Sequence, residues 1–151
     1  MYAFPDKKGR PICLVPEVTG IVQEAWRSEW SKQTRGARRV FYVARCYRYE
    51  RPQRGRYREF TQIGIELLNG QAPSDRQEVE DLLRQALDAT KVSYAFDANV
   101  KRGLGYYIED GFEARAPQLG AQEQLAGGGR YAEGIGWAIG LDRLLLALEA
   151  L

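Results

Sequence analysis

The chain has 151 residues, of which 44% are hydrophobic and 28% are charged, and its formal net charge is +2. This length and composition predict one globular, soluble domain with a real hydrophobic core. The chain contains no histidine, which excludes Ser–His and Cys–His catalysis and imidazole metal sites. Any chemistry must therefore use Arg, Glu, Gln, Tyr, Thr or backbone groups.

Neither a membrane segment nor a signal peptide is expected. No apolar run approaches the ~20 residues that span a bilayer, and the N-terminus lacks the apolar core of a signal peptide. Cys13 and Cys46 both lie in apolar, strand-like runs without metal-ligand spacing, so we expect them to be reduced core residues. These features predict a cytoplasmic protein that does not contact a membrane.

The N-terminal part is expected to contain two short strands and a helix. Residues 1–15 predict the strands, joined by a turn at Asp6–Arg10, and Pro16–Gln33 predict an entry turn and the helix. Glu17 and Thr19 lie where this helix begins. They admit two interpretations: groups that cap the helix, which the local sequence favours, or a carboxylate and a hydroxyl that bind an ammonium group. The helix has an apolar stripe at a spacing of four, made by Val18, Val22, Trp26 and Trp30.

The stretch Arg45–Glu66 is the most informative part of the sequence. Two runs of alternating residues flank Pro52 and Gly55, a pattern that predicts a β-hairpin with a long tip. On the returning strand one face is apolar and the other is mainly polar, and Gly64 in the polar face suggests that some group approaches the backbone there. The apolar face consists of Thr61, Ile63, Ile65 and Leu67, and the polar face of Phe60, Gln62, Gly64 and Glu66.

Arginines crowd the tip of this hairpin. With only Glu50 and Glu59 to balance them, they favour an anionic ligand, either a polyphosphate or a nucleic-acid backbone, over a solvated surface ribbon. Because the net charge of the whole chain is small, nucleic-acid binding would have to depend on this local cluster. The arginines are Arg45, Arg48, Arg51, Arg54, Arg56 and Arg58.

The second half of the chain predicts two helices and several strands. Ser74–Gln77 has the pattern of a capping box at the start of a helix, and a terminal helix begins at Leu141. The apolar faces of the two helices are Val79, Leu82, Leu83, Ala86 and Leu87, and Leu141, Leu144, Leu145, Leu148 and Leu151. Extended segments are expected at Lys91–Val100, from the glycine-rich turn Lys101–Tyr107 to Arg115, over Gly120–Gly129 and over Gly134–Gly140.

Two features near the C-terminus suggest an anion. Gly127–Gly129 followed by Arg130 is a weak sign of a phosphate cradle, since flexible glycine loops are commoner. Arg143 lies in the first turn of the terminal helix, where the helix dipole disfavours a cation, so we expect an anionic ligand or a salt bridge beside it.

Several antiparallel strands with a few helices and no βαβ repeat predict an α+β fold, in which helices flank an antiparallel β-sheet. Arg48–Gln62 resembles motif 2 of the class II aminoacyl-tRNA synthetases in its histidyl-tRNA synthetase form, and Gly140–Arg143 resembles motif 3. The resemblance covers nearly the whole chain. It implies that residues 1–151 form a single catalytic core of the class II fold, which activates histidine with ATP to histidyl-adenylate as part of histidine–tRNA ligation.

The resemblance also implies an ATP site. Arg48 would bind the α-phosphate and the amino-acid carboxylate, Arg102 would support the α-phosphate during adenylation, and Arg143 would lie across the adenine and γ-phosphate, which makes these three arginines the implied catalytic residues. Mg2+ would arrive with ATP, with no metal ligand from protein side chains. The implied ATP-binding residues are Arg48, Glu50, Arg56, Arg58, Phe60 and Arg143.

A histidine pocket is implied in the same way. Pro16–Thr19 resembles the segment whose acid and hydroxyl hold the α-amino group of histidine, and Arg102–Tyr107 and Ala126–Tyr131 resemble the two histidine-specific signatures. Gly105 and Ile108 depart from the first signature. The implied histidine-binding residues are Glu17, Thr19, Gln62, Glu66, Tyr106, Tyr107 and Tyr131.

Three departures concern whole segments. The chain begins after the place of motif 1, which supplies much of the dimer interface in the family; 35 residues between Glu66 and Arg102 are too few for the usual insertion domain; and nothing after Leu151 corresponds to an anticodon-binding domain. We therefore expect amino-acid activation, and leave open a homodimer and the charging of tRNA for histidine.

Two other functions fit parts of the sequence. One is a non-catalytic, histidine-sensing paralogue that resembles the regulatory subunit of ATP phosphoribosyltransferase, although such proteins tend to lose parts of the ATP site that this chain retains. The other is a nucleic-acid-binding module that uses the arginines from Arg35 to Arg58 and would show a steep salt dependence.

Overall fold

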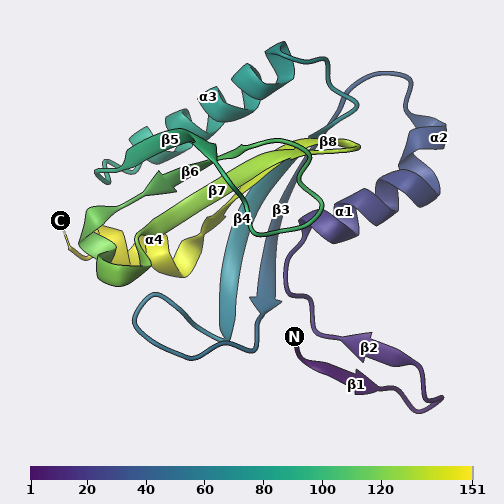
Figure 1. The fold of residues 1–151 in the computed structure, drawn as a ribbon, viewed down its shortest axis with the longest axis horizontal. Coiled ribbons are helices and arrows are strands. Elements are labelled where there is room, and N and C mark those ends of the chain that lie inside the picture. The colour runs from purple at the N-terminus through teal and green to yellow at the C-terminus, as the bar shows by residue number, and fades with distance from the viewer. Residues whose placement is uncertain (151) are drawn as a thin grey trace.

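Six antiparallel strands form the central sheet of the protein. The computed structural model describes residues 1–150, so Leu151 of the expected terminal helix lies outside the described residues. The strand order is β3-β4-β8-β7-β6-β5, and each neighbouring pair is antiparallel (Figure 1). The strands are β3 (Arg38–Tyr47), β4 (Glu59–Leu68), β5 (Ala95–Val100), β6 (Gly111–Arg115), β7 (Gln124–Tyr131) and β8 (Gly134–Gly140).

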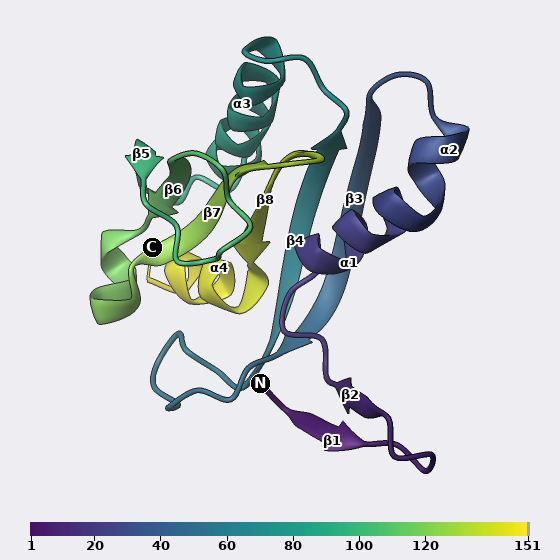
Figure 2. The ribbon, with the colours of Figure 1, turned by 45° about the vertical axis from the view of Figure 1, so that its right-hand side comes forward.

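Helices pack against this sheet in two separate places. α3 (Ser74–Asp88) and α4 (Leu141–Leu148) share the main core cluster with β4, β6, β7 and β8. α1 (Thr19–Ala25) packs in a second cluster with residues of β3 and β4, and Figure 2 shows it beside these strands, apart from α3 and α4. The predicted α+β class is confirmed. The remaining helical segments are a π-helical turn at Trp26–Trp30, α2 (Ser31–Gln33) and a 3₁₀ segment at Pro117–Gln122.

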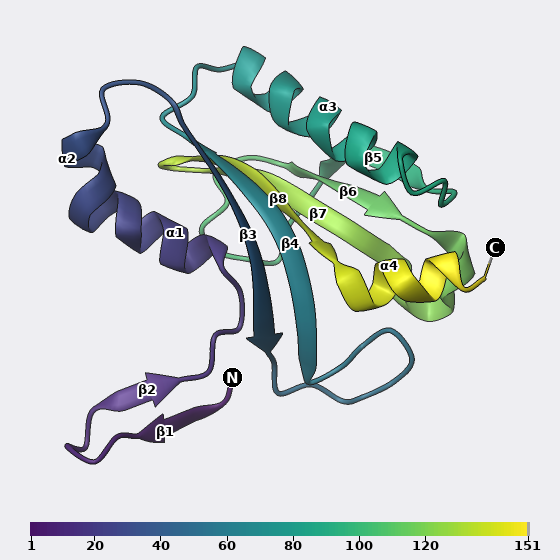
Figure 3. The ribbon, with the colours of Figure 1, turned by 180° about the vertical axis from the view of Figure 1, so that it is seen from behind.

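A second, two-stranded sheet precedes α1. β1 (Ala3–Pro5) and β2 (Pro11–Cys13) form the hairpin expected for residues 1–15, and it projects away from the main sheet (Figure 3). Nothing in residues 1–150 forms a layer over either face, and every residue of its strands is exposed. The prediction that Cys13 is a core residue is therefore wrong, whereas Cys46 is fully buried as expected.

The long hairpin is formed by β3 and β4, whose register pairs Arg38 with Leu68 and Tyr47 with Glu59. The two predicted faces of β4 are confirmed. Three residues of the apolar face, Ile63, Ile65 and Leu67, belong to the main core cluster or pack against it, and Phe60 of the other face packs in the second cluster. The polar face therefore lies on the same side as α1, where the helix and the hairpin together leave room for a site.

Local predictions in the second half need correction. Ser74 is already the first residue of α3, so its hydroxyl donates to the Gln71 carbonyl (2.8 Å) and no capping box forms. Leu82 and Leu145 are exposed, because the apolar faces of their helices are narrower than the leucine pattern suggests. The return strand begins at Gln124 rather than at Gly120, since a 3₁₀ segment occupies the preceding residues.

The packing of α3 generates a test of the main core cluster. Leu83→Ala removes a fully buried side chain and should lower the free energy of unfolding by about 2–5 kcal/mol. Leu82→Ala, at the neighbouring position of the same helix where the side chain is 43% exposed, should cost no more than about 1 kcal/mol. Urea denaturation of both variants measures this difference, and equal losses would contradict the assignment of the buried face.

Candidate active site

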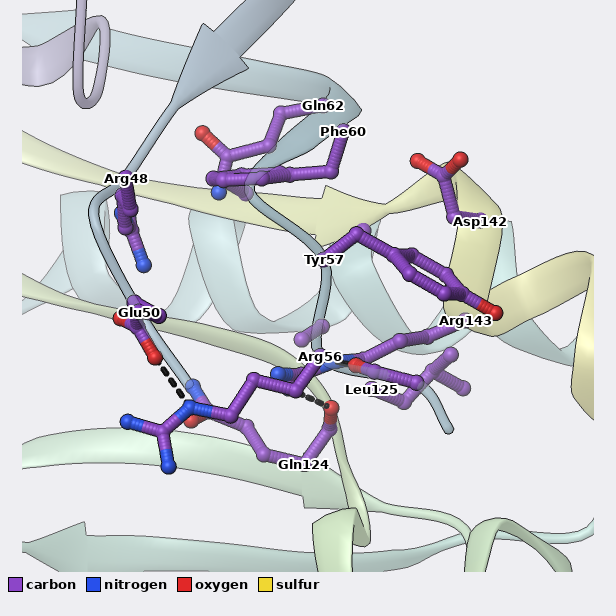
Figure 4. A pocket seen from close by; sticks show the side chains of 14 residues that line it. Arg48, Glu50, Arg56, Tyr57, Phe60, Gln62, Gln124, Leu125, Asp142 and Arg143 are labelled. Atoms are coloured by element: carbon purple, nitrogen blue, oxygen red, sulfur yellow. Dashed lines mark hydrogen bonds and ion pairs between the residues drawn. The ribbon is translucent and has the colours of Figure 1, made fainter. Parts of the chain in front are cut away.

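Two adjoining cavities open on the polar face of the hairpin. The hairpin cavity lies between the hairpin, β7 and the start of α4; Figure 4 shows its lining. The loop cavity lies between the segment before α1, β3, β4 and the 101–110 segment. Four residues line both cavities and therefore stand where the two meet: Arg48, which follows β3, with Gln62 of β4, Gln124 of β7 and Ala138 of β8.

The hairpin cavity contains two guanidinium groups without a carboxylate partner. Within residues 1–150, neither Arg48 nor Arg143 takes part in a salt bridge. Arg48 donates from Nε to the Pro16 carbonyl (2.9 Å), and Arg143 donates to the carbonyls of Gly55 (2.6 Å) and Gln124 (2.7 Å). Burial and the positive charge of Arg48 lower the pKa of Arg143. An anion between these two groups would remove an electrostatic cost.

The tip of the hairpin is held by its own side chains. Arg56 forms an ion pair with Glu50, and Arg58 donates to the Glu50 carbonyl (2.9 Å). Arg48 lies over the ring of Phe60, 5.0 Å from its centre. Of the predicted ATP-binding residues, all but Arg58 line the hairpin cavity. Arg58 instead lies over the ring of Tyr49, so its contact with a phosphate remains a prediction.

The loop cavity has a carboxylate at the start of α1. Glu17 accepts a hydrogen bond from the Gly20 backbone (3.1 Å) and another from the Tyr106 hydroxyl (2.6 Å). Glu17 therefore accepts a hydrogen bond from a backbone N–H in the first turn of α1 and also forms part of the wall of the loop cavity. Thr19 does not cap the helix: its hydroxyl donates to Glu66 (2.7 Å) instead. The capping interpretation thus fits Glu17 but not Thr19, and the binding of an ammonium group by this pair stays a prediction.

Glu66 lies behind the wall of the loop cavity rather than in it. The residue is 1% exposed, and its carboxylate accepts hydrogen bonds from Thr19 (2.7 Å) and from Tyr131 (2.9 Å). Burial raises the pKa of Glu66 to about 7, although both hydroxyls oppose the shift. Five of the predicted histidine-binding residues line the loop cavity, namely Glu17, Thr19, Gln62, Tyr106 and Tyr107, and the two that do not are Glu66 and Tyr131.

The group that approaches Gly64 is a side chain of the protein. Tyr42 lies opposite Gly64 in the β3–β4 register, and its ring occupies the space that a Cβ at position 64 would need. The Tyr42 hydroxyl has no hydrogen-bond partner among the described residues, and Tyr42 lines the loop cavity. Tyr42 was not among the residues predicted from the sequence, although its pairing with Gly64 across the predicted hairpin was a signal for it.

Arg102 is positioned by strand glycines and a carboxylate. It donates to Glu113 (2.8 Å), another residue that sequence analysis missed. A Cβ at Gly127 would lie 2.6 Å from the Arg102 guanidinium, and one at Gly129 would lie 2.8 Å from the ring of Tyr107. The glycine triplet is therefore neither a flexible loop nor a phosphate cradle. It is part of β7, where the missing side chains admit Arg102 and Tyr107.

Glu66 generates a pH-dependent prediction. The pKa of Glu66 in the folded protein, about 7, exceeds the ordinary 4.5. Protonated Glu66 therefore contributes stability to the folded protein that is fully present below about pH 4.5 and is lost as the pH rises through about 7. Glu66→Gln cannot titrate, so its free energy of unfolding relative to wild type should rise by on the order of 3 kcal/mol across this window. Urea denaturation at several pH values measures this difference, and a constant difference would overturn the assignment.

Comparison with known sequences identifies relatives of the chain. A model of the family described as histidyl-tRNA synthetase matches residues 1–94. The histidine–tRNA ligase of Methanosphaerula palustris is 27% identical over 250 residues, which include 98% of this chain and 61% of the relative. That of Methanocorpusculum labreanum is 45% identical over 94 residues, which are 62% of this chain and 23% of the relative. The chain thus spans about six tenths of the length of the first relative.

Solved structures share the fold. The apo histidyl-tRNA synthetase of Staphylococcus aureus matches with a TM-score of 0.81 and 22% identity, over 99% of this chain and 61% of that one. A structure described as an ATP phosphoribosyltransferase regulatory subunit/histidyl-tRNA synthetase from Bacillus halodurans has a TM-score of 0.80 and 16% identity. The match covers 97% of this chain and 67% of that one. A pyrrolysyl-tRNA synthetase from Desulfitobacterium hafniense matches with a TM-score of 0.75 and 21% identity, over 97% of this chain and 52% of that one.

The fold is that of the class II aminoacyl-tRNA synthetases, and the predicted resemblance is confirmed by both sequence and structure. Among residues 1–150, no helix combines the length and the apolar character that crossing a membrane requires. The match to residues 1–94 includes the whole β3–β4 hairpin with its arginines. The chain belongs to the histidyl-tRNA synthetase family.

Proposed function

We propose that the chain activates histidine with ATP to form histidyl-adenylate. The observation that carries this proposal is the position of Arg48, which lines both cavities and has no carboxylate partner within residues 1–150. A nucleotide in the hairpin cavity and an amino acid in the loop cavity would meet at its guanidinium. Because Nε is bonded to Pro16, the two terminal nitrogens remain to bind the α-phosphate and the amino-acid carboxylate.

The reaction needs charge neutralisation rather than proton transfer. A carboxylate oxygen of histidine attacks the α-phosphorus, a new P–O bond forms, and the bond to the leaving pyrophosphate breaks. The attacking carboxylate is already ionised, so no general base is required, and a chain without histidine can carry out the step. Arg48 and Arg102 would hold the two anions together and stabilise the charge that builds on the transferring group, with Arg143 on the nucleotide side.

Mg2+ enters this proposal with the nucleotide. Its chemistry is to neutralise phosphate charge. The carboxylates that line the hairpin cavity are Glu50 and Asp142, and both are already bonded, to Arg56 and to the Thr61 backbone (2.7 Å). We therefore assign no metal ligand to the protein.

The loop cavity has the groups that histidine would require. Glu17 is a carboxylate within the cavity wall, suited to the α-amino group, and Gln62 adds an amide where the two cavities meet. Tyr106 and Tyr107 supply hydroxyls and ring faces. Glu66 would act on the imidazole through the hydroxyls of Thr19 and Tyr131 or, if these rotate, directly; its predicted direct contact stays a prediction.

A histidine-sensing regulator remains the second candidate. The neighbour from Bacillus halodurans has nearly the same TM-score as the synthetase from Staphylococcus aureus, so the fold does not separate the two functions. The pair of uncompensated arginines favours the enzyme, because a histidine sensor has no need of a polyphosphate site. Transfer to tRNA, dimerisation and a cytoplasmic location belong to the proposal as expectations from the relatives.

Pyrophosphate exchange tests activation. The purified chain should catalyse ATP–pyrophosphate exchange with histidine but not with alanine, glutamine or no amino acid. Arg48→Ala should lower the rate by at least about 100-fold, because it removes the group shared by both substrates. Arg45→Ala is the matched control: this exposed arginine of β3 pairs with Glu59 and lines neither cavity. Saturable histidine binding without exchange would instead support the regulator.

The assignment of Glu17 to the α-amino group has its own test. Glu17→Gln keeps one oxygen to accept the bond from Gly20, and its amide NH2 can donate to the Tyr106 hydroxyl in place of the second oxygen. The charge is removed, so the KM for histidine should rise about tenfold or more while the KM for ATP changes less than about twofold. Glu24→Gln, an exposed position of α1, serves as the control. An equal rise of both KM values would contradict this role for Glu17.

A further inference from the structure

The 101–110 segment carries Arg102, Tyr106 and Tyr107 into the loop cavity, yet it forms no helix or strand. It connects β5 to β6, and most of its residues are exposed. Its internal backbone bonding is sparse: Tyr107 donates to Leu104 (3.3 Å). A segment of this kind opens at low cost in free energy unless other parts of the molecule hold it. Something outside the segment must therefore set where its three functional side chains lie.

Arg76 of α3 holds both ends of the segment. Its guanidinium donates to the Ala98 carbonyl before the segment (2.6 Å) and to the Asp110 carbonyl at its end (3.0 Å). Ala98 falls where the β5–β6 register shifts, between the pairs Asp97–Glu113 and Val100–Gly111. An irregular register leaves ladder groups unpaired, so the arginine supplies a donor that the sheet does not. One side chain thus ties together the two strands from which the segment emerges.

Glu109 connects Arg76 to a buried ion pair. Its carboxylate accepts hydrogen bonds from Arg76 (3.0 Å) and from Arg130 of β7 (3.2 Å). Arg130 also forms two hydrogen bonds with Asp75 (2.6 and 2.9 Å), whose side chain is 2% exposed. In addition, the Ile108 backbone donates to the Arg130 carbonyl (3.0 Å). The chain of contacts runs from the start of α3 through β7 to the last residues of the segment.

We propose that Arg76, with Glu109, Arg130 and Asp75, forms a loop clamp that positions Arg102, Tyr106 and Tyr107 for histidine activation. The inference rests on the proposed function. Arg76 lines neither cavity, so it acts through the segment and is a positioning residue. It uses all three guanidinium nitrogens, since Nε also donates to Glu80 (2.7 Å), and this fixes its plane.

The test compares two arginines of the same helix. Arg76→Met keeps the apolar stem and removes the donors to the segment. Arg84→Met is the matched control, because Arg84 lies over the ring of Phe96 in β5 (3.6 Å) and contacts neither end of the segment. Arg76→Met should lower kcat/KM for histidine by at least about tenfold while the KM for ATP changes less than about twofold, and Arg84→Met should change kcat/KM less than about twofold.

A second readout does not depend on activity. Trypsin cleavage after Lys101, an exposed residue at the start of the segment, should be at least about fivefold faster in Arg76→Met than in wild type, with cleavage after Lys7 in the β1–β2 turn as the internal reference. Equal rates at Lys101 in wild type and variant would overturn the clamp. If wild type shows no pyrophosphate exchange, the proposed function fails, and the cleavage ratio still decides the clamp.

A milder variant, Glu109→Gln, tests the clamp even if Arg76→Met fails to fold. Glu109 is on the segment itself and its side chain is 40% exposed, so Glu109→Gln should leave the free energy of unfolding nearly unchanged. It should nevertheless raise the KM for histidine by about threefold and increase cleavage after Lys101. A general loss of stability without the difference between histidine and ATP would reduce Arg76 to a structural residue and overturn the proposal.

Discussion

The site depends on two positive charges that the fold brings together without neutralising them. Arg48 comes from the end of β3 and Arg143 from the start of α4, and the carbonyls that bind them belong to the segment before α1, the hairpin tip and β7. These carbonyls orient the guanidinium groups but do not cancel their charge, so an anion bound in this cavity would offset the charge. The fold tolerates this arrangement because the two charges lie at an open cavity, where water screens part of their repulsion.

Glycines in the central strands determine what the sheet can present to the site. On β7, alternate glycines admit Arg102 and Tyr107, and the glycine between them admits Phe112 of the core. On β8, the Glu66 carboxylate occupies the space that a Cβ at Gly136 would need. A strand normally gains stability from its side chains, and glycine also raises the entropy cost of ordering it. Here the strands give up both, and side chains from neighbouring elements occupy the space instead.

The sequence predicted the parts that depend on local pattern. The alternation along Arg45–Glu66 was sufficient for the hairpin and its two faces, and the spacing of Val18, Val22, Trp26 and Trp30 for the helix. It failed where a neighbour distant in the chain decides the outcome. Cys13 is exposed because no other described element packs on the β1–β2 hairpin. Glu66 is buried behind Thr19 and Tyr131 because α1, β4 and β7 come together there. The partner of Arg102 could not be inferred either, because Glu113 becomes its neighbour only through the β5–β6 connection.

The structure shows where the two residues that depart from the first histidine-specific signature, Gly105 and Ile108, lie in the 101–110 segment. Gly105 has open space where a Cβ would be, and Ile108 is 64% exposed, so neither change alters a wall of the loop cavity directly. The effect of Gly105 has to pass through the path of the backbone between Arg102 and Tyr107. A glycine widens the range of paths that this backbone can take, which makes external restraint more important. The same segment is the one whose ends Arg76 joins. An arginine of α3 that lines neither cavity therefore restrains the backbone that carries Arg102, Tyr106 and Tyr107.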